Sequence, residues 1–194
     1  TETITVTDEE TGETTEEVVT KDSSVVSSVI YVGSNDGMLH AFDDTTGQEL
    51  WAFIPPDLLP NLQYANDTDK HYYYVDSSPV IYHYDYDGDG KVNLDDLASD
   101  PDSDATDEKA LLVCGMHRGG GTSQITQPAN PDSDPPVSRG SYFALDISNP
   151  ESPSYRWTIN SETDGFGELS QTWSLPRLTK VKVGSLAKVV AIFG

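Results

Sequence analysis

The feature that most constrains the fold of this chain is a pattern of short strands and turns that returns along the sequence. The first copy, residues 28–55, reads as strand, tight turn, strand, turn, strand in SVIYVGSNDGMLHAFDDTTGQELWAFIP. Its short apolar runs, bounded by turn residues, predict three β-strands over 29–33, 38–43 and 49–54. The Asn-Asp-Gly turn at 35–37 supplies the positive φ angles that a hairpin needs.

A second copy of the pattern occupies residues 110–159. Three features of the first copy recur in the second. Gly33 corresponds to Gly115, the Ala-x-Asp segment 41–43 corresponds to 144–146, and Trp51 corresponds to Trp157. An extended segment around Pro79 precedes this copy, and another around Pro176 leads into a third copy of the first strand. Short strands with glycine and tryptophan at fixed places are typical of a β-propeller, whereas a β-sandwich would not predict the return of the motif.

The repeat therefore predicts an all-β chain that forms a partial β-propeller of four-stranded blades. Residues 25–194 would make about two blades and the start of a third, with insertions at 85–108 and 118–139. Residues 1–24 are acidic and rich in Thr and Glu, and we expect an arm or a hairpin there; residues 56–71 are predicted to form a loop. Because propellers use about four to eight blades, we expect the chain to be part of a larger protein or to close a ring with other chains.

The charge of the chain limits its partners. Asp and Glu number 33 against 11 Lys and Arg, which gives a formal net charge of −22. Such a surface repels phosphate groups, so nucleic acid is not an expected partner. No run of 18 apolar residues occurs, so no membrane-spanning segment is expected. Cys114 is the single cysteine and lies in an apolar run, which favours a buried residue over a nucleophile.

Residues 85–96, DYDGDGKVNLDD, carry oxygen-bearing side chains at the spacing of an EF-hand-like calcium loop. The expected ligands of one Ca²⁺ are the side chains of Asp85, Asp87, Asp89, Asn93 and Asp96 and the backbone carbonyl of Lys91. Gly90 would form the sharp turn, and the Asp in the last place resembles the dockerin version of the loop. The alternative is a polar turn without metal. We expect the loop to lie between the outer strand of one blade and the inner strand of the next.

The first copy resembles the pyrroloquinoline-quinone (PQQ) propeller repeat of quinoproteins, D-G-x-L-x-A-x-D-x-x-T-G-x-x-x-W. The matching residues are Asp36, Gly37, Leu39, Ala41, Asp43, Thr46, Gly47 and Trp51. In that repeat the motif docks each blade to the next, so the resemblance implies structural roles for these residues, with Trp51 and Trp157 wedged between blades.

Residues 28–194 further resemble the C-terminal propeller of the PilC/PilY family, large secreted proteins associated with type IV pili. NDGMLHAF followed by ELWAFIPP carries the resemblance, together with YYYVDSSPVI and GSYFALDISNP. It implies a cell-surface, pilus-associated protein, secreted through the periplasm, that acts by binding in pilus assembly, retraction control and surface attachment. Pilins or minor pilins and a host or abiotic surface are the implied partners, and the family's propeller also carries calcium loops.

Two other functions fit the same repeat. One is a quinoprotein-like dehydrogenase fragment, and the other is a non-catalytic envelope scaffold. The dehydrogenases often carry a vicinal disulfide, which a single cysteine excludes, and the four histidines show no zinc-binding spacing. The scaffold lacks the NDGMLHAF signature and the calcium loop. We therefore expect a binding protein and not an enzyme.

Overall fold

The computed structural model describes residues 2–7, 14–19, 28–66, 69, 72–85, 88, 90, 92, 108–119 and 140–194, with the backbone alone described before residue 28. In chain order the elements are β1 (Glu2–Thr7), β2 (Thr14–Val19), β3 (Val29–Gly33), β4 (Leu39–Asp43), β5 (Glu49–Phe53), the 3₁₀ helix η1 (Pro56–Tyr64), β6 (Val80–Tyr84), β7 (Lys109–Cys114), β8 (Tyr142–Asp146), β9 (Ser154–Ile159), β10 (Arg177–Val183) and β11 (Leu186–Ile192). Strands dominate, as the repeat predicts.

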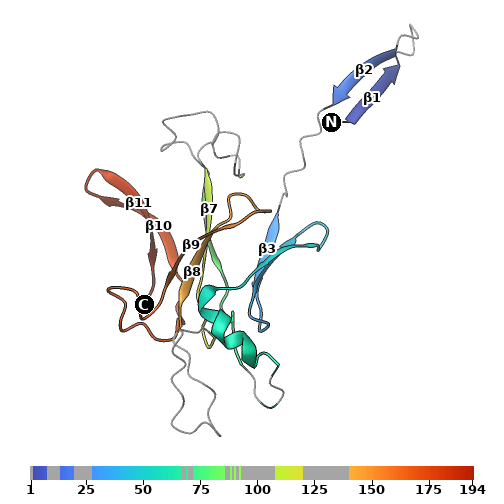
Figure 1. Ribbon diagram of the computed structural model, residues 1–194. Coiled ribbons are helices and arrows are strands. Elements are labelled where there is room, and N and C mark those ends of the chain that lie inside the picture. Colours follow the sequence, from blue (N-terminus) through green and yellow to red (C-terminus); the bar gives the residue numbers. More distant parts are fainter. Residues whose placement is uncertain are drawn as a thin grey trace.

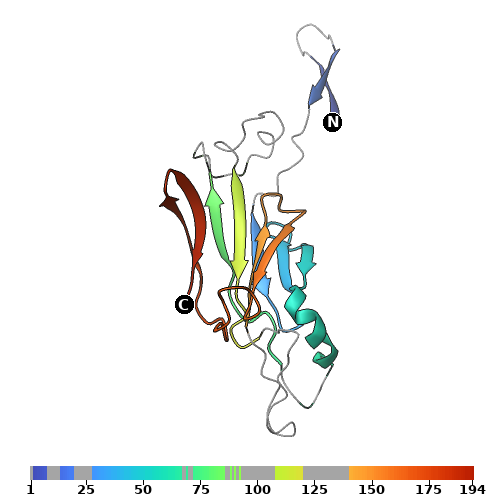
Figure 2. The same ribbon diagram turned by 60° about the vertical axis from the view of Figure 1, so that its left-hand side comes forward.

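The strands form antiparallel sheets of neighbouring strands in chain order. After the hairpin β1–β2 come the first sheet (β3-β4-β5), the second sheet (β6-β7-β8-β9) and the third sheet (β10-β11). The second sheet lies between the other two (Figures 1 and 2). The strands predicted over 29–33, 38–43 and 49–54 are confirmed as β3, β4 and β5.

The sequence repeat is also a repeat of backbone geometry. Ala41 on β4 lies opposite Trp51 on β5, and Ala144 on β8 lies opposite Trp157 on β9. The strand register shifts directly after each of these alanines. Such irregularities bend and twist a strand at a defined place, so the first two sheets share one structural plan.

The order of strands in the second sheet corrects one expectation. β6 pairs with β7, from Val80 opposite Val113 to Tyr84 opposite Lys109, so the 85–108 connection joins two neighbouring strands of one sheet. The expectation that the 85–96 segment lies between two blades was therefore wrong. The strand that follows Pro79 begins a sheet, since its backbone groups bond the next strand of the chain and not the preceding sheet.

The hydrophobic core fills the space between the first and second sheets. Leu39 of β4 and Leu112 and Phe143 of the second sheet are fully buried in it. The rings of Phe53 and Phe143 lie 5.5 Å apart across this interface. The indole Nε1 of Trp51 also donates a hydrogen bond of 2.7 Å to the carbonyl oxygen of Pro150, in the β8–β9 connection. Trp51 thus docks one sheet to the next.

The glycines of the repeat leave room for the chain that crosses between sheets. A Cβ atom on Gly33 would lie 2.3 Å from the carbonyl oxygen of Val75, and one on Gly115 would lie 3.1 Å from the carbonyl oxygen of Thr172, in the segment between β9 and β10. Val75 in turn donates its N–H to the carbonyl oxygen of Ser34. Any side chain at these two positions would push the crossing segment away, so glycine is required for close packing.

Residues 56–71 contain a 3₁₀ helix where we expected a loop. Pro56 suits the start of the helix because its missing N–H has no partner there anyway. Leu58 is fully buried in the core, and the Tyr74 hydroxyl donates to the Asn61 carbonyl oxygen over 3.1 Å. Tertiary anchoring therefore fixes this segment. Within the part of the chain described, no helix is long and apolar enough to cross a membrane.

The third sheet is tied to the second by ring contacts. Tyr142 of β8 and Phe193, which follows β11, have ring centroids 4.2 Å apart. β10 runs beside β6, and the Lys180 ammonium lies 3.4 Å from the centre of the Tyr84 ring. β10 is thus the neighbour of the strand that leads into the 85–96 loop.

We predict that Trp51→Phe lowers the free energy of unfolding by about 1 kcal/mol, the usual net value of one intramolecular hydrogen bond. Phenylalanine keeps an aromatic ring between the sheets but cannot donate to Pro150. Chemical denaturation measures the change. The control is Trp173→Phe, because Trp173 is 52% exposed and its indole N–H donates to Gln171, two residues away in the same segment. Equal effects of the two substitutions would contradict a docking role for Trp51.

Candidate functional site

The described part of the 85–96 loop begins with a carboxylate that organises the backbone. Asp85 follows the last residue of β6 and accepts hydrogen bonds from the N–H of Gly88, 2.6 Å from Oδ1, and of Gly90, 2.7 Å from Oδ2. Gly88 and Gly90 have φ angles of 80° and 82°, in the left-handed region that favours glycine. The chain therefore turns sharply around Asp85.

The structure places only part of the predicted ligand set. Asp85 is described, whereas Asp87, Asp89, Lys91, Asn93 and Asp96 lie outside the described residues. Among the residues that the structure does describe, no group of three or more His, Cys, Asp and Glu is arranged to hold a metal ion. Val92, the one residue of 91–96 that the structure describes, packs against the core cluster between the sheets.

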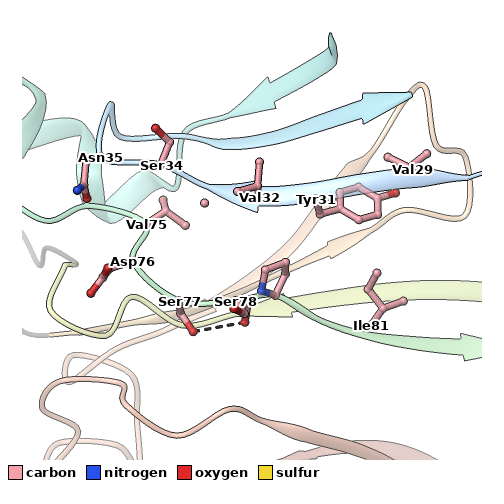
Figure 3. A pocket seen from close by; sticks show the side chains of 12 residues that line it. Val29, Tyr31, Val32, Ser34, Asn35, Val75, Asp76, Ser77, Ser78 and Ile81 are labelled. Atoms are coloured by element: carbon pink, nitrogen blue, oxygen red, sulfur yellow. Dashed lines mark hydrogen bonds between the residues drawn. The ribbon is translucent and has the colours of Figure 1, made fainter. Parts of the chain in front are cut away.

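A second feature is a groove beside β3 of about 430 Å³ (Figure 3). Val29 and residues 31–35, from β3 and its following turn, line one side, and residues 75–79 with Ile81 line the other. Val32 and Ile81 remain 44% and 47% exposed there. Apolar side chains and backbone thus line the groove, together with the polar Ser34, Asn35, Asp76 and Ser77.

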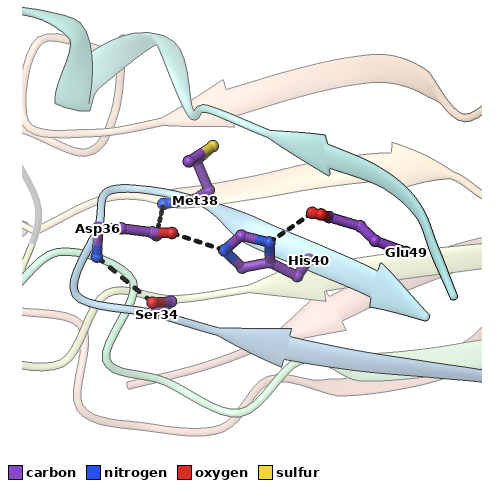
Figure 4. Close-up of polar contacts among 5 residues, drawn as sticks. All are labelled: Ser34, Asp36, Met38, His40 and Glu49. Carbon is purple, nitrogen blue, oxygen red and sulfur yellow. Dashed lines mark hydrogen bonds and ion pairs between the residues drawn. The ribbon is translucent and has the colours of Figure 1, made fainter. Parts of the chain in front are cut away.

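A third feature is a histidine held by two carboxylates on the first sheet (Figure 4). His40 Nδ1 lies 2.7 Å from Glu49 Oε1, and His40 Nε2 lies 2.9 Å from Asp36 Oδ2. The other Asp36 oxygen accepts the N–H of Met38, which fixes the aspartate in the β3–β4 turn. The two ring nitrogens of His40 thus face carboxylates on opposite sides, an arrangement that favours the imidazolium form.

The sequence did not single out this cluster, because its three residues are spread over a hairpin. The hydrogen bond to Glu49 contributes most to raising the pKa of His40, burial opposes the rise, and the contact with Asp36 adds to it. The register of β4 against β5 explains why Glu49 lies near His40. Glu49 lies opposite Phe42, two residues along β4 from His40, so Glu49 is the diagonal neighbour of His40 across the two strands.

Cys114 is buried, as predicted from its apolar neighbours. Its side chain is fully buried, and burial raises the pKa of the thiol to about 12. A thiol needs to ionise to act as a nucleophile. Cys114 is therefore a core residue of β7.

No protein-family model matches the chain. Curated relatives match most of it, and two of them serve as examples. The type IV pilus biogenesis factor PilY1 homolog of Xylella fastidiosa strain Temecula1 is 32% identical over 178 residues, which are 90% of this chain and 9% of the relative. The type IV pilus biogenesis factor PilY1 of Pseudomonas aeruginosa strain UCBPP-PA14 is 29% identical over 164 residues, which are 82% of this chain and 11% of the relative. The chain spans about a tenth of the length of these relatives.

One solved structure is also similar. The crystal structure of the Pseudomonas aeruginosa PilY1 C-terminal domain matches at a TM-score of 0.47 and 24% sequence identity. The match covers 84% of this chain and 24% of that one.

We predict that Glu49→Gln lowers stability near pH 6 and has little effect near pH 9. Because the folded-state pKa of His40 is raised, its contribution is fully present below the ordinary histidine pKa of about 6.5 and is lost as pH rises through the raised value. The expected loss is below about 1 kcal/mol, the scale of a partly exposed ion pair. Urea denaturation across this pH range measures it.

The control for this prediction is Glu168→Gln, the same chemical change at an exposed loop position. Its effect should not follow the histidine titration. A difference between wild type and Glu49→Gln that stays constant from pH 6 to pH 9 would contradict the role assigned to His40.

Proposed function

We propose that this chain, which belongs to the PilC/PilY family of type IV pilus biogenesis factors, is one part of a longer surface protein that acts in pilus assembly by binding. Both relatives described above are named for type IV pilus biogenesis, and the chain covers only about a tenth of each. The pilus-associated location, the contacts with pilins or minor pilins, retraction control and attachment to a surface all belong to this proposal.

We further propose that the sheets are blades of a propeller completed by the longer protein. The observation that supports this is the link from Trp51 of the first sheet to Pro150 of the second, together with the shared register shifts after Ala41 and Ala144. The register shifts recur at matching places of the repeated sequence. A stack of sheets built on one plan can be extended by further copies of that plan.

The 85–96 loop is proposed to hold one Ca²⁺ at the end of the second sheet. The side chains of Asp85, Asp87, Asp89, Asn93 and Asp96 and the Lys91 carbonyl would supply oxygens, the ligands that Ca²⁺ takes in proteins. The hydrogen bonds from Gly88 and Gly90 to Asp85 support this, because they hold the chain turned around one carboxylate. Each carboxylate oxygen has a second lone pair for a cation.

Calcium would act within the second sheet. The loop connects β6 to β7, and Val92 in its middle packs on the core. When bound, the ion would neutralise several of the loop's carboxylates, which otherwise repel one another at short range. Binding would order the connection at the end of β6, the strand that also contacts Lys180 of β10.

We predict that calorimetric titration detects one Ca²⁺ site with Kd of about 10⁻⁴–10⁻³ M, the range of extracellular modules. The double substitution Asp87→Asn with Asp89→Asn should abolish binding. Asp102→Asn with Asp104→Asn is the matched control, because it removes the same charge just outside the twelve-residue pattern. If both double variants bind Ca²⁺ as the wild type does, or if the wild type binds no Ca²⁺ at millimolar concentration, the loop is a polar turn.

The pilus function is tested in the organism that carries the gene. Deletion of the full gene should remove surface pili and twitching motility, and the intact gene should restore them. The Asp87→Asn with Asp89→Asn gene should restore less, while the Asp102→Asn with Asp104→Asn gene should restore as much as wild type. Normal piliation in the deletion strain would overturn the proposed function, whatever the calcium titration shows.

A further inference from the structure

The second sheet contains a strand whose counterpart is missing from the first. β6 pairs with one edge of β7, while β8 pairs with the other. β3 is the counterpart of β7 because Gly33 and Gly115 occupy matching places. In the described part of the chain, β3 pairs with β4 and has no strand on its other edge. The first sheet is therefore one strand short of the second.

The free edge of β3 presents backbone groups. Asp44 donates its N–H to Ser28, and Ser34 donates to Met38, so these pairs mark the hydrogen-bonded positions of the β3–β4 ladder. Bonded and non-bonded pairs alternate along antiparallel strands. The N–H and C=O groups of Ile30 and Val32 consequently face β4. Those of Val29, Tyr31 and Gly33 face away from it, toward the edge where β7 receives β6.

The groove lies where the missing strand would run. It is bounded by β3 and by the 75–81 segment, which leads into β6. In the second sheet the equivalent space beside β7 is occupied by β6, and the next inner strand, β10, lies directly beside β6. If the first sheet followed the same plan, it would have a strand that pairs with β3, as β6 pairs with β7, and that lies beside β6, as β6 lies beside β10. The groove in Figure 3 occupies the position of this strand.

The exposure of the lining supports the same conclusion. Val32 is 44% exposed on the β3 side of the groove. Ile81 on the opposite side is 47% exposed. An open strand edge flanked by apolar side chains is a template for pairing with another segment.

We propose that the groove receives one β-strand from the longer protein, which runs antiparallel to β3 and bonds the outward backbone groups of Val29, Tyr31 and Gly33. This inference rests on the proposal that the chain is part of a longer protein. The relatives, of which this chain covers about a tenth, have ample further chain to supply the strand. Main-chain hydrogen bonds would provide its affinity, as in other cases of strand addition. The strongly acidic character of this chain favours an inserted strand with few carboxylates.

The test uses Val32→Cys, in this 194-residue chain and in the full-length protein that contains it. The substitution places in β3 the residue that β7 carries at the matching position, so the sheet should tolerate it. A maleimide reagent is applied under native conditions, and mass spectrometry measures its attachment at position 32. We expect fast labelling in the isolated chain and labelling slower by about tenfold or more in the full-length protein, since a covered site reacts only after local opening.

Asp164→Cys is the control, because this exposed turn residue should react equally in both proteins. Buried Cys114 should stay unlabelled in both. Equal labelling at position 32 in the two proteins would show that the edge stays open and would overturn the proposal.

Slow labelling of Val32→Cys in the isolated chain at micromolar concentration would also overturn the proposal, because the groove would then be filled by this chain itself. If labelling of the isolated chain slows only at high protein concentration, a second copy of the chain covers the groove. That outcome would also overturn the proposal. Amide exchange of β3 in the two unsubstituted proteins provides a second measurement that needs no variant. These readouts are independent of piliation, so the proposed function and the strand proposal can fail separately.

Discussion

The packing of the first sheet on the second is the interaction on which the rest of the structure depends. Small sheets need a covered apolar face to be stable, and the buried residues of β4, β7 and β8 supply one shared face for both sheets. The ring contact of Phe53 with Phe143 and the Trp51–Pro150 hydrogen bond fix how the sheets meet. The 3₁₀ helix and the crossing segment that follows it close one side of the same core through Leu58, Tyr74 and Val75.

The acidic residues of this chain repeatedly stabilise turns. Asp43 Oδ1 accepts the N–H groups of Thr45 and Thr46, and hydrogen bonds from Thr46 lower the pKa of its carboxyl. Asp146, at the matching place of the second sheet, accepts from Ser148. The carboxylate of Asp85 accepts hydrogen bonds from the backbone N–H groups of Gly88 and Gly90. A chain with a net charge of −22 thus uses part of its negative charge to satisfy backbone donors at strand ends.

The sequence was sufficient to predict the strands and the repeat, because a strand's apolar pattern and its turn residues are local. It also identified the family, since the NDGMLHAF and ELWAFIPP segments are specific, and the curated relatives confirm this. The position of the 85–96 loop within one sheet was missed, because strand pairing is decided by contacts across the chain. The 3₁₀ helix that begins at Pro56 was missed for the same reason, because Leu58 stabilises it through contacts with the core that are not local in sequence.

The candidate sites were predictable to different degrees. The oxygen pattern of the proposed calcium loop is contiguous in sequence, so its expected ligands could be named in full. Of these the structure describes Asp85, which accepts the N–H groups of Gly88 and Gly90. The His40 cluster depends on a hairpin register that brings Glu49 beside it. The groove depends on the absence of a strand partner for β3 in the described chain, which only a comparison of two folded sheets reveals.

The long connections of the second sheet have a consequence for the order of folding. Five residues, 34–38, join β3 to β4, whereas 24 residues, 85–108, join β6 to β7. Closing the longer loop costs roughly 1.4 kcal/mol more in chain entropy. The first sheet, built from tight hairpins, should therefore form early and offer its apolar face as a surface on which β7 and β8 assemble. Ordering of the 85–108 connection would then speed folding of the second sheet, since it shortens the chain that must be closed.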